Sequence, residues 1–103
     1  MISKKITKYD LVEAVYQNSK HEKKEIQHVT DCLIEELKKS LARGFTIELR
    51  GFGTFEPRLR KERSAARNPK TGVAVRSRAH YVAAFRAGRE LKSSLLELPV
   101  EES

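Results

Sequence analysis

The stretch Phe45-Thr46-Ile47-Glu48-Leu49-Arg50-Gly51-Phe52-Gly53-Thr54-Phe55 determines the fold that this sequence predicts. Three apolar residues alternate with polar ones in its first half, and a period of two is typical of a strand covered on one face. Gly51 and Gly53 then allow the backbone to turn sharply. Thr54 and Phe55 begin a second strand, so the stretch predicts two neighbouring strands of an antiparallel sheet.

Toward the C-terminus, the second strand continues past Pro57 while basic residues replace its apolar ones. The run Asn68-Pro69-Lys70-Thr71-Gly72 has turn chemistry, because proline presets one central φ and glycine accepts a positive φ. The chain becomes apolar again from Tyr81 to Phe85. We therefore predict a sheet over residues 45–85 that extends into a long two-stranded arm over 57–78, with Pro69 at its tip.

Toward the N-terminus, two segments have helical periodicity. Thr7 can cap a helix over about Lys8–Ser19, since Asp10 stands at its third position. After a polar link at 20–22, apolar residues recur at steps of three and four as far as Leu41, and Gly44 supplies a stop. These helices predict a helical body over residues 1–44.

The remainder, residues 86–98, predicts a C-terminal helix, which begins at about Gly88 and ends before Pro99. Residues 99–103 are expected to form a tail. The fold class is therefore α+β, and the simplest organisation is one domain over residues 1–103 with one projecting arm.

The second predicted helix carries more apolar surface than the first helix can cover. Cys32 and Ile34 widen its apolar stripe, while its other side is charged. A chain of 103 residues also buries a smaller share of its surface than a larger protein does. Both features suggest a dimer whose helical body forms the interface.

The excess positive charge lies on the arm. The chain has a formal net charge of +7, and the segment 57–78 alone holds eight bases and one acid, so bases and acids balance elsewhere. A charge run is usually only a solvated face, but here the opposing acids are missing. We interpret the arm as an electrostatic footprint for a polyanion. Its basic residues are Arg58, Arg60, Lys61, Arg63, Arg67, Lys70, Arg76 and Arg78.

Arginine dominates this set, and its planar guanidinium forms forked hydrogen bonds with phosphate. A two-stranded ribbon is narrow enough to enter a DNA groove, and alternation places Arg58 and Arg60 on one face, with Arg76 and Arg78 on the returning strand. Pro69 is rigid and apolar, so it could press between base pairs. A role in shaping the turn alone explains it equally well.

Three blocks of this sequence closely resemble the bacterial HU and integration host factor proteins. The blocks are Gly51-Phe52-Gly53-Thr54-Phe55-Glu56, Arg67-Asn68-Pro69-Lys70-Thr71-Gly72 and Phe85-Arg86-Ala87-Gly88-Arg89-Glu90-Leu91-Lys92. The arm looks one residue longer than the common HU pattern. The resemblance implies an intertwined dimer with two arms around DNA, and a nucleoid-associated, histone-like protein that binds the minor groove, bends the duplex and helps to compact the bacterial chromosome.

The resemblance also assigns roles by position. Pro69 matches an intercalating proline, with Arg67 and Asn68 beside it in the minor groove. Phe52, Phe55 and Phe85 match an aromatic core. The sequence departs from the family pattern at Pro57, which would need an edge or bulge position, and at Glu22, where a serine-like cap is common. The other implied DNA contacts, beyond the basic residues of the arm, are Lys8, Arg86, Arg89 and Lys92.

Other classes of function have weaker support. His28, Asp31 and Cys32 lie within one helical turn, but they do not make a closed zinc site, and we expect no enzyme activity, metal, cofactor or small-molecule substrate. A basic RNA-binding protein is the main alternative. The sequence has no apolar run long enough for a signal peptide or a membrane span, which predicts an intracellular protein. The family resemblance implies a place in the cytoplasm at the nucleoid. It leaves open a homodimer or a heterodimer with a related subunit.

Overall fold

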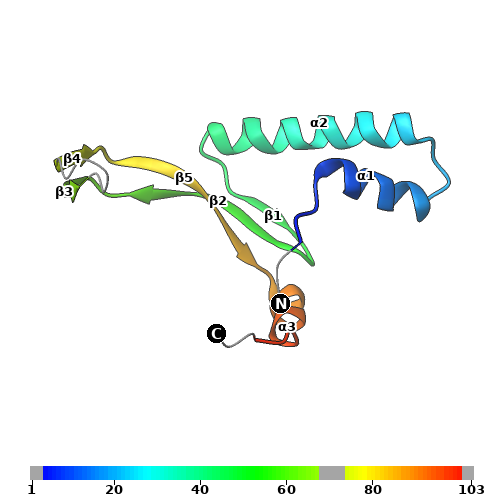
Figure 1. The fold of residues 1–103 in the computed structure, drawn as a ribbon. Coiled ribbons are helices and arrows are strands. Elements are labelled where there is room, and N and C mark those ends of the chain that lie inside the picture. The colour runs from blue at the N-terminus through cyan, green and yellow to red at the C-terminus, as the bar shows by residue number, and fades with distance from the viewer. Residues whose placement is uncertain (1–3, 68–73, 101–103) are drawn as a thin grey trace.

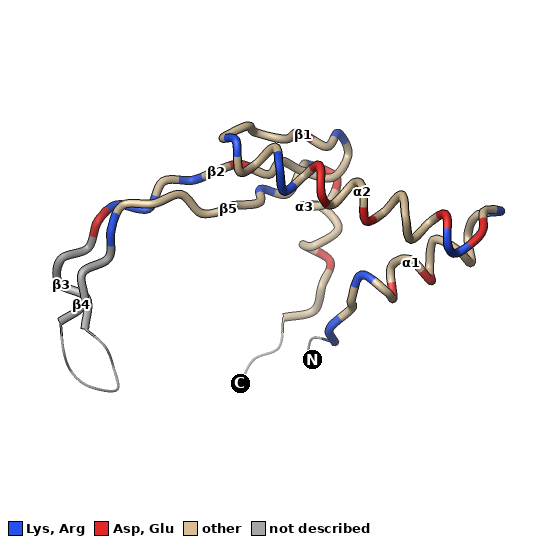
Figure 2. Tube along the Cα trace, turned by 90° about the horizontal axis from the view of Figure 1, so that it is seen from above, with Lys and Arg blue, Asp and Glu red and all other residues tan. Residues whose placement is uncertain are grey.

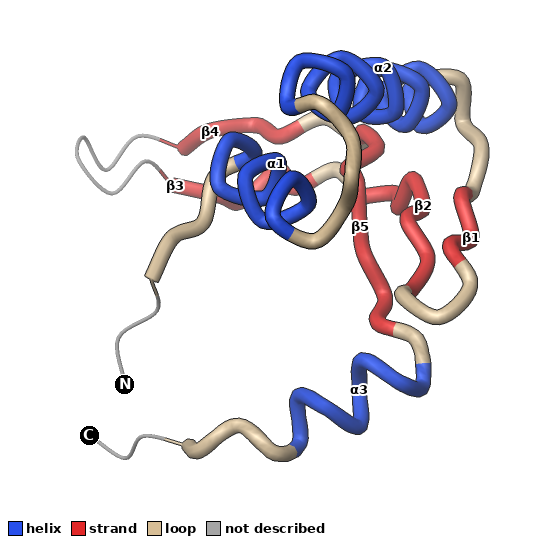
Figure 3. Tube along the Cα trace, turned by 90° about the vertical axis from the view of Figure 1, so that its right-hand side faces the viewer, coloured by secondary structure: helices blue, strands red, loops and turns tan. Residues whose placement is uncertain are grey.

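The computed structural model describes residues 4–67 and 74–100, of which 63–67 and 74–77 are described by their backbone alone. Figure 1 shows two helices packed along one side of a sheet, a ribbon leaving the sheet at one end, and a third helix on the other side. Figure 3 shows the same layering end-on. The order of elements is that of the predicted α+β fold.

Helix α1 spans Lys8–Gln17, and Thr7 caps it as predicted. The Thr7 hydroxyl oxygen accepts from the Asp10 amide at 3.3 Å, while the Asp10 carboxylate accepts from the Thr7 amide at 2.9 Å. The helix ends two residues earlier than predicted. The reason is Asn18, whose backbone leaves the helical region and whose side-chain amide donates to the carbonyl of Ala14 at 2.9 Å.

Helix α2 spans Lys23–Ala42. Gly44 has a φ of +88°, and its amide donates to the Leu41 carbonyl at 2.9 Å, which confirms the predicted stop. Phe45 donates back to the Ser40 carbonyl at 3.0 Å. Because that bond keeps Phe45 in the helix terminus, strand β1 starts only at Ile47 and spans Ile47–Leu49, two residues later than the alternation predicted.

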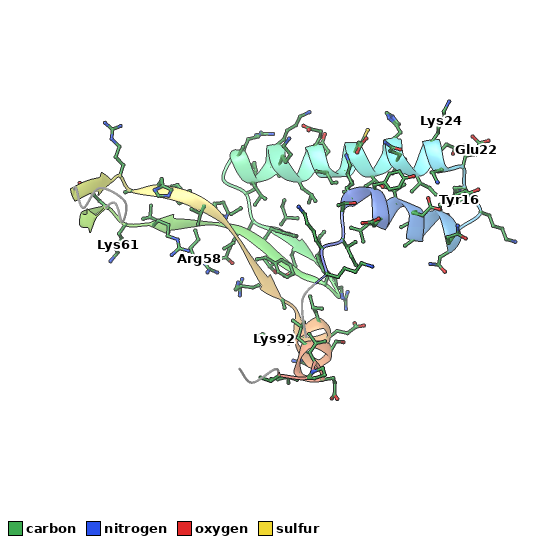
Figure 4. All side chains as sticks on the ribbon, viewed as in Figure 1. Tyr16, Glu22, Lys24, Arg58, Lys61 and Lys92 are labelled. Atoms are coloured by element: carbon green, nitrogen blue, oxygen red, sulfur yellow. The ribbon has the colours of Figure 1, made fainter. Side chains whose placement is uncertain are left out.

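A charged and aromatic cluster joins α1 to α2. The Lys23 ammonium forms an ion pair with Glu13 and lies 5.3 Å and 5.8 Å from the ring centres of Tyr16 and Tyr9. Hydrogen bonds from Lys23, and to a smaller extent from Gln17, lower the pKa of Glu13. The hydrogen bond to Glu13 in turn raises the pKa of Lys23. Figure 4 shows Tyr16 at the end of the helical pair farthest from the ribbon.

The sheet is antiparallel, with the strand order β1-β2-β5. Strand β2 spans Gly53–Arg60 and β5 spans His80–Ala87. The pairing of β1 with β2 ends at Ile47↔Phe55, whereas β2 and β5 stay paired out to Arg60↔His80. At Pro57, one edge of β2 therefore has no neighbouring strand among the described residues. Proline requires such an edge position because it has no N–H to donate to a neighbouring strand.

The ribbon has an interruption that the sequence did not predict. Strands β3 (Arg63–Arg67) and β4 (Ala74–Ser77) form a second, two-stranded sheet beyond β2 and β5. The register is the same on both sides of the break, but it shifts by one residue between Arg63 and Ala66. That shift is a β-bulge, which leaves one extra residue on β3.

Helix α3 spans Arg89–Leu96 with Gly88 as its N-cap, which confirms the predicted start at about Gly88, but it ends two residues before Leu98. The predicted boundary between sheet and helix segment at residue 86 is wrong. Arg86 and Ala87 are strand residues because β5 stays paired with β2 as far as Gly53. The amide of Gly88 then donates to the Phe52 carbonyl at 2.9 Å, which fixes where α3 begins. No helix within residues 4–67 and 74–100 combines the length and the apolarity that crossing a bilayer requires.

Candidate nucleic-acid interface

The sheet presents two chemically different faces. Residues opposite each other across β2 and β5 share a face, and successive residues alternate between faces. The pairs Thr54↔Arg86, Glu56↔Ala84, Arg58↔Val82 and Arg60↔His80 therefore form one face. We call the set Thr54, Glu56, Arg58, Arg60, His80 and Arg86 the arginine face.

The basic side chains of the arginine face are accessible. Arg58, Arg60, His80 and Arg86 are all exposed, as is the neighbouring Lys61. Figure 4 shows Arg58 and Lys61 extending from the ribbon on the side away from α2. Figure 2 shows lysine and arginine positions following β2 as it leaves the body. Arg58 and Arg60 lie on one face, as predicted, and the residues opposite them are Val82 and His80.

Glu56 is the acid of β2 on this face, and it contacts two of its arginines. Its Oε1 accepts from Nε of Arg86 at 2.8 Å, and its Oε2 lies 3.8 Å from a terminal nitrogen of Arg58. The Glu56 side chain is only 25% exposed, compared with 63% for that of Arg86. A mostly buried carboxylate therefore holds a guanidinium whose side chain is largely exposed to solvent.

The opposite face is apolar and holds the predicted aromatic cluster. Phe55 and Phe85 are cross-strand partners with ring centres 4.8 Å apart, and Phe52 packs at 5.0 Å from Phe85. A Cβ on Gly53 would lie 2.6 Å from the Phe85 ring and 2.5 Å from the Arg86 carbonyl oxygen, so this close approach requires glycine. The cluster thus packs against the paired strands β2 and β5, which carry Arg58 and Arg86.

Three further predicted contacts lie in the body. Lys8 opens α1, and its ammonium pairs with Asp31 of α2 at 2.5 Å, with both side chains about half exposed. A phosphate at this site would compete with Asp31 for the ammonium. Arg89 and Lys92 are exposed on α3. Figure 4 shows Lys92 on the same side of the sheet as Arg58, the side away from α2.

The basic residues of the distal arm lie mostly beyond the part of the chain whose side chains are described. Arg63, Arg67 and Arg76 lie in β3 and β4, where the backbone alone is described. Arg78 is exposed at the break of the ribbon, and its carbonyl accepts from Nδ1 of His80 at 2.7 Å. The predicted tip contacts Asn68, Pro69 and Lys70 lie outside the described residues.

Sequence reasoning missed the roles of Glu56, Asp31 and His80 at this interface. The alternation places Arg58 and Arg60 on one face, but only the register across β2 and β5 brings Arg86 to Glu56. On α2, Nε2 of His28 and Sγ of Cys32 lie 3.8 Å apart. Within the described part of the chain, no group of three or more potential ligands could hold a metal ion.

Comparisons with known proteins agree with this geometry. The family model described as "Bacterial DNA-binding protein" matches residues 6–95. Integration host factor subunit alpha of Aliivibrio salmonicida (strain LFI1238) is 36% identical over 97 residues, which is 94% of this chain and 98% of the relative. The subunit alpha of Myxococcus xanthus (strain DK1622) is 39% identical over 98 residues, which is 94% of this chain and 75% of the relative.

Solved structures show the same fold. The HU of Anabaena, from a cocrystal with DNA, superposes with a TM-score of 0.82 at 33% identity, covering 90% of this chain and all of that one. An HU mutant from Thermotoga maritima gives a TM-score of 0.64 at 24% identity, covering 87% of this chain and 99% of that one, and supports the fold alone. With the match over residues 6–95, these likenesses show that the chain belongs to the bacterial DNA-binding protein family of HU and integration host factor.

Proposed function

We propose that this protein is a nucleoid-associated, histone-like architectural protein that binds double-stranded DNA, bends it, and so helps to compact and organise the bacterial chromosome. The observation that carries the proposal is the charge distribution, since the ribbon segment 57–78 holds seven net positive charges and the rest of the chain holds none. Exposed arginines on a stiff strand pair suit phosphate contacts, which supply much of the affinity for DNA. The protein acts without catalysis, cofactor or metal, in the cytoplasm at the nucleoid.

The arms bind the minor groove in this proposal. HU and integration host factor are themselves type examples of minor-groove proteins that insert apolar wedges between base steps, so this step is taken over from the family. By position, Pro69 is the wedge, and Arg67 and Asn68 lie beside it in the groove. Arg58, Arg60, Arg76 and Arg78 contact the backbone nearby, together with Lys61, Arg63 and Lys70 of the arm. Lys8, Arg86, Arg89 and Lys92 contact the flanks.

The binding unit in this proposal is an intertwined dimer. In the single chain, Val12 and Ile26 are the only buried apolar side chains among the described residues, whereas Val29 and Leu33 on α2 are 64% and 57% exposed. Phe52 and Phe85 are also open to solvent. A second copy, or a related subunit in a heterodimer, would cover these apolar surfaces and set two ribbons side by side.

A competition titration tests this function. A fluorescent straight duplex is titrated with the protein at several salt concentrations, and then competed with nicked duplex, straight duplex or double-stranded RNA. We expect duplex binding that weakens steeply with salt, with nicked DNA the best competitor because unstacking costs less there. Stronger competition by double-stranded RNA than by either DNA would favour the RNA-binding alternative and overturn the proposal.

A further inference from the structure

We propose that Glu56 is a positioning residue of the DNA-binding surface, which holds the guanidinium of Arg86 through Nε and thereby presents its terminal nitrogens to a phosphate. This inference rests on the DNA binding proposed above and on Arg86 as one of its contacts. Glu56 is negatively charged, as a phosphate is, and does not itself contact DNA in this proposal. Its contribution is the orientation of a neighbour.

The register of the sheet brings Glu56 and Arg86 together. Arg86 lies opposite Thr54, and Glu56 lies opposite Ala84, so the acid and the arginine are diagonal neighbours across β2 and β5. Diagonal positions on one face are within reach of long side chains.

The hydrogen bond to Glu56 uses Nε of the Arg86 guanidinium and does not use its two terminal nitrogens. Glu56 Oε1 accepts from Nε of Arg86 at 2.8 Å, whereas forked recognition of a phosphate uses two N–H groups of the guanidinium in parallel. The terminal nitrogens of Arg86 take no part in the bond to Glu56. Because that side chain is 63% exposed, a ligand can reach them from solvent.

Glu56 has two opposite effects on DNA binding, and two substitutions separate them. Its negative charge repels phosphate, and its hydrogen bond removes rotamer freedom that Arg86 would otherwise lose on binding. Glu56→Gln keeps an acceptor and removes the charge, whereas Glu56→Ala removes both. The ratio of the two affinities therefore reports positioning at constant net charge.

The test measures duplex affinity by fluorescence anisotropy for both variants of the full chain, with Arg86 present and with Arg86→Ala. We expect Glu56→Gln to bind at least as tightly as the wild type. Glu56→Ala should bind about two- to tenfold more weakly than Glu56→Gln, the range expected for ordering one long side chain. With Arg86→Ala, this difference should vanish. Equal affinities with Arg86 present, or a difference that persists without it, would overturn the inference.

A spectroscopic readout without DNA guards against a folding effect. The ¹⁵N signal of Arg86 Nε should be shifted from that of free arginine in the wild type and in Glu56→Gln, and should move to the free position in Glu56→Ala. Glu48 gives the matched control, because it lies opposite Thr54 on the same face. Glu48→Ala and Glu48→Gln should bind alike. Wild type that fails to bind duplex overturns the proposed function as well, whereas normal wild-type binding with an unmoved Arg86 signal overturns this inference alone.

Discussion

Thr7 and Asp10 close the start of α1 with reciprocal hydrogen bonds, whereas Glu22 at the start of α2 forms no side-chain capping bond. We predict that Thr7→Ala lowers the free energy of unfolding by about 1 kcal/mol, because an amide at the helix start loses its acceptor. Glu22→Ala should change it far less. Urea unfolding at one fixed protein concentration measures both, and equal effects would show that the capping box adds no stability.

The same capping box predicts a pH dependence. Hydrogen bonds from the backbone and hydroxyl of Thr7 lower the pKa of Asp10 below its ordinary value of 3.8. A lowered pKa in the folded state contributes stability that is present above pH 3.8 and is lost as the pH falls through the folded value. Wild type should therefore exceed Asp10→Asn in stability near neutral pH, and the gap should narrow as the pH falls below 3.8. A gap independent of pH would contradict this.

At the scale of elements, local patterns predicted the helices and the inner strands because each element carries its own period. The alternation from Thr54 to Arg60 even separated the arginine face from the apolar face. Local patterns do not determine the register between β2 and β5. That register depends on the length of the arm that connects the two strands, and the sequence pattern does not define this length. This is why the break of the ribbon, the bulge after Arg63 and the pairing of Arg86 with Glu56 were not predicted.

The ribbon also has a salt signature. In a dimer with two arms, Arg58 and Arg60 make four phosphate contacts if each side chain neutralises one. Replacing both with alanine should then reduce the slope of log affinity against log salt by about 3.6, since each contact on B-DNA contributes about 0.9. Lys24→Ala is the control, because Figure 4 shows Lys24 on α2 far from the ribbon. Titrations at four salt concentrations give the slopes. An unchanged slope in the double variant would exclude these arginines from the backbone contacts.

The whole chain is too extended to be a compact monomer. Its radius of gyration is 18.7 Å, whereas a compact domain of this length has about 13 Å. We predict that the wild type sediments as a dimer at micromolar concentration. Leu33→Glu should dissociate or unfold it, while Lys24→Glu on the charged side of α2 should leave it dimeric. A folded wild-type monomer at that concentration would contradict the intertwined body.

The proposed function requires the arms to bend DNA, and energy transfer between dyes at the two ends of a duplex measures that bend. In HU and integration host factor, the type examples of this mechanism, an apolar wedge unstacks a base step and bent DNA wraps more of the protein. Saturating wild type should bring the ends closer and raise the transfer. Pro69→Ala should fold and still bind straight duplex, but raise the transfer less. If wild type saturates the duplex without changing the transfer, the arms do not bend DNA.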